Sequence, residues 1–353
     1  VVFVAFYNTT WNGATWSNGP PNATTRAIFA GNYTSSGDLF ACSVRINSGV
    51  VTFNANHSLV VTNDVVVAAG SLIFNNNASL VQVNNASINT GNITYRRSAM
   101  PMRRFDYTYW SSPIANQVLS TFSPLTPTDK FFVFNPTIAN WSNVAAASSM
   151  TVGKGYLVRA PLSYNLVTTT VYNGSFVGVP NNGIVASPVL VSASDFNLIG
   201  NPYPSAVNAD LFLSDPLNVG VVDATIYFWT HNTPIAAGQY TSNDYAIYNY
   251  LGGTGTSSAP NTGVNSSVPN GKIASGQGFF IKALSNGSAT FSNAMRIVGD
   301  NNQFFRMQSP LNPSTSETVV SEKHRVWLDI VDQQGSYKQT LVGYATNATM
   351  GID

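Results

Sequence analysis

Two consecutive stretches of the chain, Gly49–Ala69 (GVVTFNANHSLVVTNDVVVAA) and Gly70–Thr90 (GSLIFNNNASLVQVNNASINT), have the same length and the same pattern. Each stretch begins with a glycine that recurs at Gly91, so the period is 21 residues. Residues in the same phase are alike: Val51, Leu72 and Ile93; Phe53, Phe74 and Tyr95; Ser58-Leu59-Val60 and Ser79-Leu80-Val81. A fixed period of roughly 20 residues filled with short β-branched runs is typical of a β-solenoid. We therefore predict an N-terminal parallel β-solenoid with 21-residue rungs.

The predicted solenoid covers residues 1–98, including an N-terminal strand and cap. An open stack of coils needs a cap, and Trp11 and Trp16, followed by two prolines, are suited to form it. The 21-residue offset also places Asn54 over Asn75. This arrangement predicts a ladder of amide hydrogen bonds from rung to rung.

The composition excludes several classes of protein. Only 9% of the residues are charged, against about 25% in an ordinary soluble domain, yet 44% are hydrophobic, so the chain is not a disordered polar tract. The formal net charge of +1 gives no electrostatic footprint for nucleic acid. Cys42 is the only cysteine, which excludes an intrachain disulfide. No apolar run reaches the roughly 18 residues of a membrane span, so we expect none.

A second duplication follows the solenoid. Residues 152–160 (VGKGYLVRA) resemble residues 275–283 (SGQGFFIKA), and a turn containing proline precedes each copy, at 110–114 and 200–204. The surrounding runs are short, β-branched and aromatic, which is typical of strands. We therefore predict duplicated β-sandwich modules of the jelly-roll or immunoglobulin-like type, at residues 99–190 and 191–308.

Residues 309–353 are predicted to be a linker and the start of a further β module. The linker begins with a stretch rich in serine, proline and threonine, and alternating strand patterns follow it. The whole chain is thus expected to be all-β.

The acidic residues and histidines predict no catalytic site. Glycosidases need a pair of carboxylates beside the scissile bond, but Asp38 and Asp64, the acids of the solenoid, are not in the same phase. His57, His231 and His324 are far apart and form no metal-spaced motif. We expect no enzyme activity, no catalytic residue and no cofactor.

Calcium is the one metal that the sequence leaves open. Aspartates lie in the Asn-rich loops of the second module, where calcium binding and ordinary Asx-turns are alternatives. These aspartates are Asp195, Asp210, Asp215, Asp223 and Asp244.

Two groups of aromatic residues are candidates for ligand binding. Flat rings beside amides suit sugar binding, because rings stack on the apolar faces of sugars. The alternative is that these rings alternate into a sandwich core, which buries aromatics heavily. The candidate residues are Tyr107, Tyr109 and Trp110 in the first module and Tyr240, Tyr245, Tyr248 and Tyr250 in the second.

The chain opens with a wholly apolar run that is a candidate for self-assembly. We interpret it as a buried strand, with donation of the strand to a neighbouring copy as a sharper hypothesis. The assembly residues would be Val1, Val2, Phe3, Val4 and Phe6.

Several motifs together resemble secreted and surface proteins of gliding Bacteroidetes such as the flavobacteria, which are adhesin-like cargo of the type IX secretion system. The motifs are Thr10-Trp11-Asn12-Gly13, Arg103-Arg104-Phe105-Asp106-Tyr107, Gly153-Lys154-Gly155-Tyr156, Gly276-Gln277-Gly278-Phe279 and Lys323-His324-Arg325-Val326-Trp327-Leu328. The resemblance implies the type IX secretion machinery as a partner and a C-terminal sorting domain, which this sequence lacks because either it is cleaved off or the chain continues beyond Asp353. It brings no catalytic residues.

From these features we expect a secreted or cell-surface protein with a structural and adhesive role. Its expected partners are surface glycans or copies of itself, with assembly into filaments or a surface layer as a further hypothesis. The alternative is a polysaccharide-binding module or a carbohydrate-active enzyme.

Overall fold

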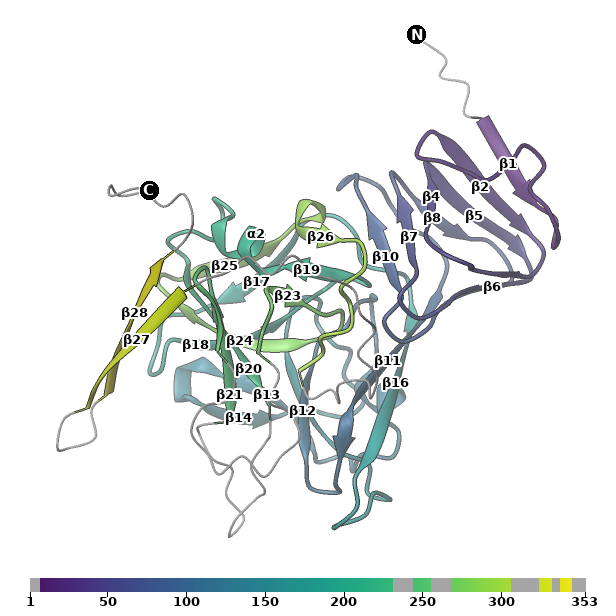
Figure 1. Cartoon of the computed structure of the whole chain (residues 1–353). Helices are drawn as coiled ribbons and strands as arrows, with labels where there is room; N and C mark the ends of the chain where they lie inside the picture. The colour runs from purple at the N-terminus through teal and green to yellow at the C-terminus, as the bar shows by residue number, and fades with distance from the viewer. Residues whose placement is uncertain (1–6, 231–243, 255–267, 306–323, 332–336, 345–353) are drawn as a thin grey trace. The chain divides into compact units, whose positions relative to one another are not determined.

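The computed structural model describes residues 7–230, 244–254, 268–305, 324–331 and 337–344 (Figure 1). The chain divides into two compact units, residues 1–308 and residues 309–353. In the second unit the described residues form one antiparallel hairpin of β27 (His324–Val331) and β28 (Tyr337–Tyr344). The first unit holds the solenoid and all the other described strands.

The N-terminal part of the first unit is a parallel β-solenoid of about four turns, which confirms the prediction from the 21-residue period. Three sets of parallel strands form its sides, because successive coils add strands to the same three sheets. The first sheet contains β1 (Tyr7–Trp11), β2 (Thr25–Ala30), β5 (Ser43–Ser48) and β8 (Val65–Val67). The second contains β4 (Leu39–Ala41), β7 (Ser58–Val61) and β10 (Ser79–Gln82). The third contains β3 (Tyr33–Thr34), β6 (Val50–Phe53), β9 (Ser71–Phe74) and β11 (Ile93–Met102).

The corners of the coils explain the sequence period. Where the chain passes from the first sheet to the third, Gly49, Gly70 and Gly91 have φ angles of +83°, +78° and +79°. Glycine adopts this left-handed region without steric cost. At the next corner Asn56 and Asn77 have φ angles of +66° and +68°, and asparagine visits this region more readily than most residues.

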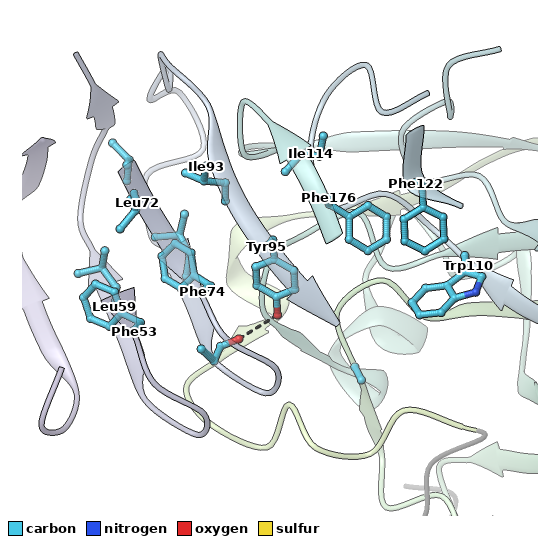
Figure 2. Close-up of a cluster of buried hydrophobic side chains, with 14 of the residues drawn as sticks. Phe53, Leu59, Leu72, Phe74, Ile93, Tyr95, Trp110, Ile114, Phe122 and Phe176 are labelled. Carbon is cyan, nitrogen blue, oxygen red and sulfur yellow. Dashed lines mark hydrogen bonds between the residues drawn. The ribbon is translucent and has the colours of Figure 1, made fainter. Parts of the chain in front are cut away.

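Apolar side chains stack inside the solenoid in the phases that the sequence shows (Figure 2). The rings of Phe53 and Phe74 are stacked with their centroids 5.3 Å apart, and Tyr95 continues the column 6.1 Å beyond Phe74. Tyr95 is fully buried, and its hydroxyl donates to the carbonyl oxygen of Ala78 over 2.8 Å. The column therefore ends on a hydrogen-bonded tyrosine.

Polar ladders run along the outside of the coils. The amide of Asn75 donates to Oδ1 of Asn54 over 3.5 Å, and Arg96 donates to Oδ1 of Asn75 over 3.0 Å. At another corner the amide of Asn84 donates to Oδ1 of Asn63 over 3.0 Å. The predicted Asn54–Asn75 ladder is thus present.

The free edge of β1 is covered by its own chain, in the segment 12–19. Thr10 accepts a backbone hydrogen bond from Ser17 N over 2.9 Å, and Thr10 N donates to Ser17 Oγ over 3.0 Å. The rings of Trp11 and Trp16 pack 5.5 Å apart over this end of the stack. The backbone groups of Thr10 are therefore not available for pairing with another strand.

The solenoid continues into the modules through one strand. β11 pairs in parallel with β9 of the solenoid and antiparallel with β16 (Thr170–Gly178). It runs through residue 98, where the sequence analysis places the boundary between the solenoid and the first module. The two parts therefore share one continuous sheet (Figure 1).

The first module has a four-stranded antiparallel sheet in the order β12-β15-β13-β14. Its inner face packs with β16 and the short helix α1 around Trp110, whose ring lies 4.9 Å from that of Phe122 (Figure 2). The remaining elements of this module are β12 (Tyr107–Trp110), α1 (Leu119–Phe122), β13 (Phe131–Asn135), the 3-10 helix η1 (Pro136–Ile138), β14 (Asn140–Asn143) and β15 (Tyr156–Arg159).

The second module has a five-stranded sheet in the order β18-β24-β20-β21-β22, and smaller sheets, β17-β25 and β23-β19-β26, pack with it around one core. β17 precedes residue 190, where the sequence analysis places a boundary, yet it pairs with β25 of the second module. The elements are β17 (Val185–Val189), β18 (Phe196–Gly200), β19 (Ala206–Asn208), α2 (Ala209–Ser214), β20 (Val222–Trp229), β21 (Tyr245–Asn249), β22 (Gly252–Thr254), β23 (Lys272–Ile273), β24 (Gly278–Ala283), β25 (Gly287–Phe291), η2 (Asn293–Met295) and β26 (Arg296–Ile297).

The two modules repeat one strand order. The strands β12, β15, β13 and β14 of the first sheet correspond to β18, β24, β20 and β21 of the second, and the duplicated motif lies on β15 and β24. In both copies the first glycine of the motif has a positive φ, +79° at Gly153 and +75° at Gly276. The duplication read from the sequence is therefore a duplication of structure.

The modules also contact each other reciprocally. Trp110 of β12 forms a β-bridge with Gln277, just before β24, and Ile199 of β18 forms one with Lys154, just before β15. Trp110 and Ile199 occupy equivalent positions, because they pair with Tyr156 and Phe279 of the duplicated motif. The edge strand of each module thus makes the same contact with the duplicated motif of the other, as in an approximately two-fold arrangement.

None of the helices in the described part of the chain is long and apolar enough to cross a membrane.

Candidate functional site

An aromatic cluster lies where the two large sheets face each other, and we call it the inter-module cluster. Its buried members are Tyr109, Leu198, Trp229 and Phe280. Half-buried residues surround them: Phe134, Trp141, Leu157, Phe196, Tyr227 and Tyr245. Every one of these ten residues lies on a strand of one of the two sheets.

Strand alternation explains how one sheet serves two cores. On β12, Trp110 faces the core of its own module, and its neighbour Tyr109 faces the other module. On β24, Phe279 and Phe280 are divided in the same way. Strands with both faces buried carry consecutive apolar residues, as these do.

Two candidates from the sequence, 136 residues apart, meet inside this cluster. The hydroxyls of Tyr109 and Tyr245 are hydrogen-bonded over 2.8 Å. Burial raises the pKa of Tyr109 well above its usual value, and burial also raises the pKa of Tyr245 to about 12. Both hydroxyls therefore stay neutral near pH 7 and hold the sheets together.

The rings in the cluster pack against each other rather than against solvent. Phe280 lies 4.9 Å from Phe134 in an edge-to-face arrangement, and 5.5 Å from Tyr109 in another. Edge-to-face pairs of this kind add about 0.5–1.5 kcal/mol beyond area burial. The inter-module cluster is thus suited to holding the two modules together.

The other aromatic candidates are spread over different environments. Trp110 and Tyr248 are buried in the cores of the first and second modules, so their faces are closed to a ligand. These two residues and Tyr109 lie in buried cores, as the alternative to ligand binding predicts. Tyr107 is half-buried, and Tyr250 is 44% exposed. Tyr240 lies outside the described residues.

The proposed assembly residues Val1, Val2, Phe3, Val4 and Phe6 also lie outside the described residues, so strand donation stays a prediction. The first described strand is β1, which begins at Tyr7.

Three of the aspartates considered for calcium accept hydrogen bonds through their carboxylates. Asp195 Oδ1 accepts from Ser192 N over 3.1 Å, Asp215 Oδ1 accepts from Leu217 N over 2.9 Å, and Asp210 Oδ1 accepts from the hydroxyl of Tyr248 over 2.8 Å. Within the described ranges, no three residues of the His, Cys, Asp and Glu types gather as metal ligands would. Calcium binding therefore stays an untested alternative to the expectation of no cofactor.

A buried arginine joins the solenoid to the second module, which sequence reasoning missed. Arg296 of β26 donates to the carbonyl oxygen of Leu80 on β10 over 2.6 Å and to Asn293 Oδ1 over 3.1 Å. Its guanidinium lies over the ring of Tyr203 at 4.7 Å. Burial lowers the pKa of Arg296 to about 10, so the side chain remains charged near pH 7.

Arg97 of β11 forms a second joint of the same kind. It donates to Asn77 Oδ1 over 3.1 Å and to the carbonyl oxygen of Asn301 over 2.5 Å, and it lies 5.1 Å from the ring of Phe304. Burial lowers the pKa of Arg97 to about 10. Its signal in the sequence is the pair Arg96-Arg97 with Arg103-Arg104 close by, but an exposed and a buried arginine look alike in a sequence.

In the described part of the chain, the aromatic rings, amides and buried arginines therefore act mainly to join the coils and the modules to one another. The model of one protein family, described as "Domain of unknown function (DUF8693)", matches residues 2–353. No curated protein and no solved structure matches the chain.

Proposed function

The chain belongs to the DUF8693 family, and we propose that it is an extracellular structural and adhesive protein in which a solenoid holds two fused β modules away from their support. One observation carries this proposal: β11 is at once the last solenoid strand of the third sheet and the partner of β16. A continuous sheet transmits a pulling force across the joint through its backbone hydrogen bonds.

Two further contacts support a stiff joint. Arg296 and Arg97 reach from one part to the other, and the inter-module cluster joins the modules. Inter-domain motion is the default unless the interface is large and hydrophobic. A body that resists bending suits a protein that holds partners at a distance.

The low charge and the motif resemblance support the exterior location. With 9% charged residues the surface depends on Asn, Ser and Thr, whose hydrogen bonding changes little with salt or pH. Such a surface suits exposure to a medium that the cell does not control. The type IX secretion machinery is the proposed export route.

The location is tested on cells that make the protein. An antibody raised against residues 7–305 is expected to label intact, unpermeabilised cells or to detect the protein in the medium. Labelling only after lysis would contradict the proposal. A cytosolic marker protein, probed in the same samples, controls for leakage.

Electron microscopy of the protein released without denaturant then separates two forms of this function. Regular polymers indicate a filament or layer subunit, and discrete particles indicate an adhesin. An adhesin is expected to retain coated beads on a glycan or cell surface under flow, and beads that wash off like uncoated ones would count against adhesion.

The polysaccharide-binding alternative needs an accessible surface. The inter-module cluster supplies little of one, because its rings pack on each other. One side of the solenoid is better suited.

A further inference from the structure

The outer side of the third solenoid sheet presents a regular row of β-branched residues, three threonines and one isoleucine, on successive coils. Thr34 of β3 pairs with Thr52 of β6, Thr52 with Ile73 of β9, and Ile73 with Thr94 of β11. Their neighbours along each strand face inward and are buried, as with Val51 and Phe53. We call this row and its flanks the threonine face.

Two parallel rows flank the first. On one side lie Val50, which is 47% exposed, and its partner Ser71. On the other side lies the ladder of Asn54, Asn75 and Arg96, which is bonded from rung to rung. The face is thus a flat grid of hydroxyls, methyl groups and amides, with its one charge at the end of the outer row.

The hydroxyls of the central row are available to a ligand. Thr34 is exposed, and Thr52 and Thr94 are half-exposed. In the described part of the chain, the side-chain oxygens of these three threonines form no hydrogen bond. Each can therefore donate and accept a hydrogen bond toward the outside.

The other two sides of the solenoid are less suited. The first sheet carries Arg26 and Arg45 on its outer side. The second sheet is covered at β10 by the second module, where Val81 is only 6% exposed and Leu80 N donates to Pro204 O over 2.7 Å. In the described solenoid, the threonine face is the long side that remains open and carries only one charge, Arg96 at the end of its outer row.

We propose that the threonine face binds an extended, uncharged polysaccharide chain that runs along the solenoid axis with one sugar over each coil. Neighbouring strands lie about 4.8 Å apart, close to the rise per residue of an extended, equatorially linked pyranose chain. Hydroxyls and amides match sugar hydroxyls, and the methyl groups of Thr and Ile match the apolar faces of sugars. This inference rests on the proposed adhesive function and names its ligand class.

Charge complementarity decides between neutral and anionic glycans. The central row and the Val50–Ser71 row carry no ionisable group, so a uronic acid chain would lose hydration of its carboxylates without finding cations in return. Arg96 alone stands at the end of the outer row. A neutral chain loses far less on binding.

The length dependence of binding tests the rung-by-rung arrangement. The probes are cello-, manno-, xylo- and chito-oligosaccharides of two, four and six sugars, titrated calorimetrically into the full chain. Because four coils line the face, the affinity for at least one series is expected to rise from two to four sugars and to gain less than about twofold from four to six. Failure to bind any neutral series, or binding of polygalacturonate alone, overturns the proposal.

Isosteric variants test the site itself. The double variant Thr52→Val and Thr94→Val removes two hydroxyls and keeps the strand preference of the residues. Because each lost net hydrogen bond weakens binding several-fold, it is expected to bind the best oligosaccharide about tenfold more weakly. The control Thr170→Val makes the same change at an exposed position. Thr170 is the first residue of β16 and pairs with Met102, whereas Thr94 of the threonine face pairs with Val177 near the other end of β16. The control is therefore expected to leave the affinity unchanged.

Other results assign the face differently. Equal affinity of the double variant, the control and the unaltered chain overturns the proposal. Self-association that Thr52→Lys abolishes would assign the face to a second copy and also overturn it. Each of these results leaves the surface location, tested by antibody labelling, standing, so failure of this inference is distinguishable from failure of the proposed function.

Discussion

The buried Arg296, whose guanidinium is held by neutral oxygens, is the most unusual residue of the described chain. The guanidinium of Arg296 is satisfied by the Leu80 carbonyl oxygen and by side-chain oxygens of Asn182, Asn293 and Ser205. In the described residues the only ion pair is Lys130–Asp129, on the surface. Fixed amide and carbonyl dipoles thus take the place of counter-ions.

Removal of one such arginine should destabilise the joint. Arg296→Met keeps most of the side-chain volume but leaves the buried oxygen of Leu80 without its donor. Unsatisfied buried groups cost about 1–3 kcal/mol each, so we expect the free energy of unfolding to fall by about 3 kcal/mol in urea titrations. Lys282→Met removes a half-exposed cation over Phe196 and should cost less than about 1 kcal/mol. Equal losses in the two variants would contradict the role given to Arg296.

Buried tyrosines predict loss of stability at high pH. Burial raises the pKa of Tyr172 and Tyr245 to about 12, whereas unfolded tyrosine titrates near 10. Their contribution is therefore complete below pH 10 and is lost as the pH rises toward 12, because the unfolded state releases protons first. Arg97 and Arg296 have folded pKa values of about 10, below the usual value of arginine. Their contribution to the free energy of unfolding therefore rises with pH over the same range, because the folded state releases these protons first.

The tyrosines should dominate, because Tyr95, Tyr109 and Tyr203 also have raised pKa values from burial. We expect the urea midpoint to be constant from pH 8 to 9.5 and to fall at pH 11. Absorbance at 295 nm should show the buried tyrosines ionising together with unfolding. A midpoint that rises above pH 10 would mean that the arginines prevail.

At the scale of elements, the second glycines of the duplicated motif let the modules approach. A Cβ on Gly155 would lie 2.5 Å from Leu198 Cγ, and a Cβ on Gly278 would lie 2.9 Å from Tyr109 Cβ. Leu198 and Tyr109 both belong to the inter-module cluster. Each motif glycine therefore faces a strand of the other module.

An alanine in place of Gly155 should push the two modules apart, because its Cβ would overlap Leu198. Overpacking typically costs about 1–3 kcal/mol, so Gly155→Ala is expected to lower the thermal midpoint by several degrees. Gly37→Ala is the matched control, because a Cβ on Gly37 has nothing within 4 Å. A Gly155→Ala protein as stable as the control would show that the modules separate without cost.

The elements also show what the sequence could predict. The coils were predictable because corner glycines and inward Val, Leu and Phe repeat at a fixed spacing. The sequence pattern of one coil therefore predicts the structure of the next. The pairing of β11 with β16 was not, since it joins segments about 75 residues apart that have no shared period. The same holds for β17, which looks like the end of one module and pairs within the other.

At the scale of the whole molecule, the first unit should unfold as one body. The shared sheet, Arg97 and Arg296 couple the solenoid to the modules, so loss of one part exposes the other. We expect a single calorimetric transition for residues 1–308, with equal calorimetric and van't Hoff enthalpies. A separate solenoid transition would contradict the stiff joint on which the proposed function rests.

The candidate site was predictable only in part. Aromatic runs marked Tyr109 and Tyr245 as notable, and the structure brings their hydroxyls together. Sequence alone could not tell which ring of an alternating strand faces which core, because both faces of β12 and β24 are covered. The threonine face escaped notice because its residues are ordinary one by one and form an array only when the coils stack.

The covered edge at β1 has a consequence for the evolution of length. The segment 12–19 closes one end of the stack, and the β modules close the other. Interior coils contact mainly their neighbours, so a duplicated 21-residue unit inserted at the Gly70 corner would find matching coils above and below it. Such an insertion extends the spacer by about 4.8 Å and leaves both ends intact. The number of coils, and with it the length of the spacer, can therefore change while the two closed ends of the solenoid stay the same.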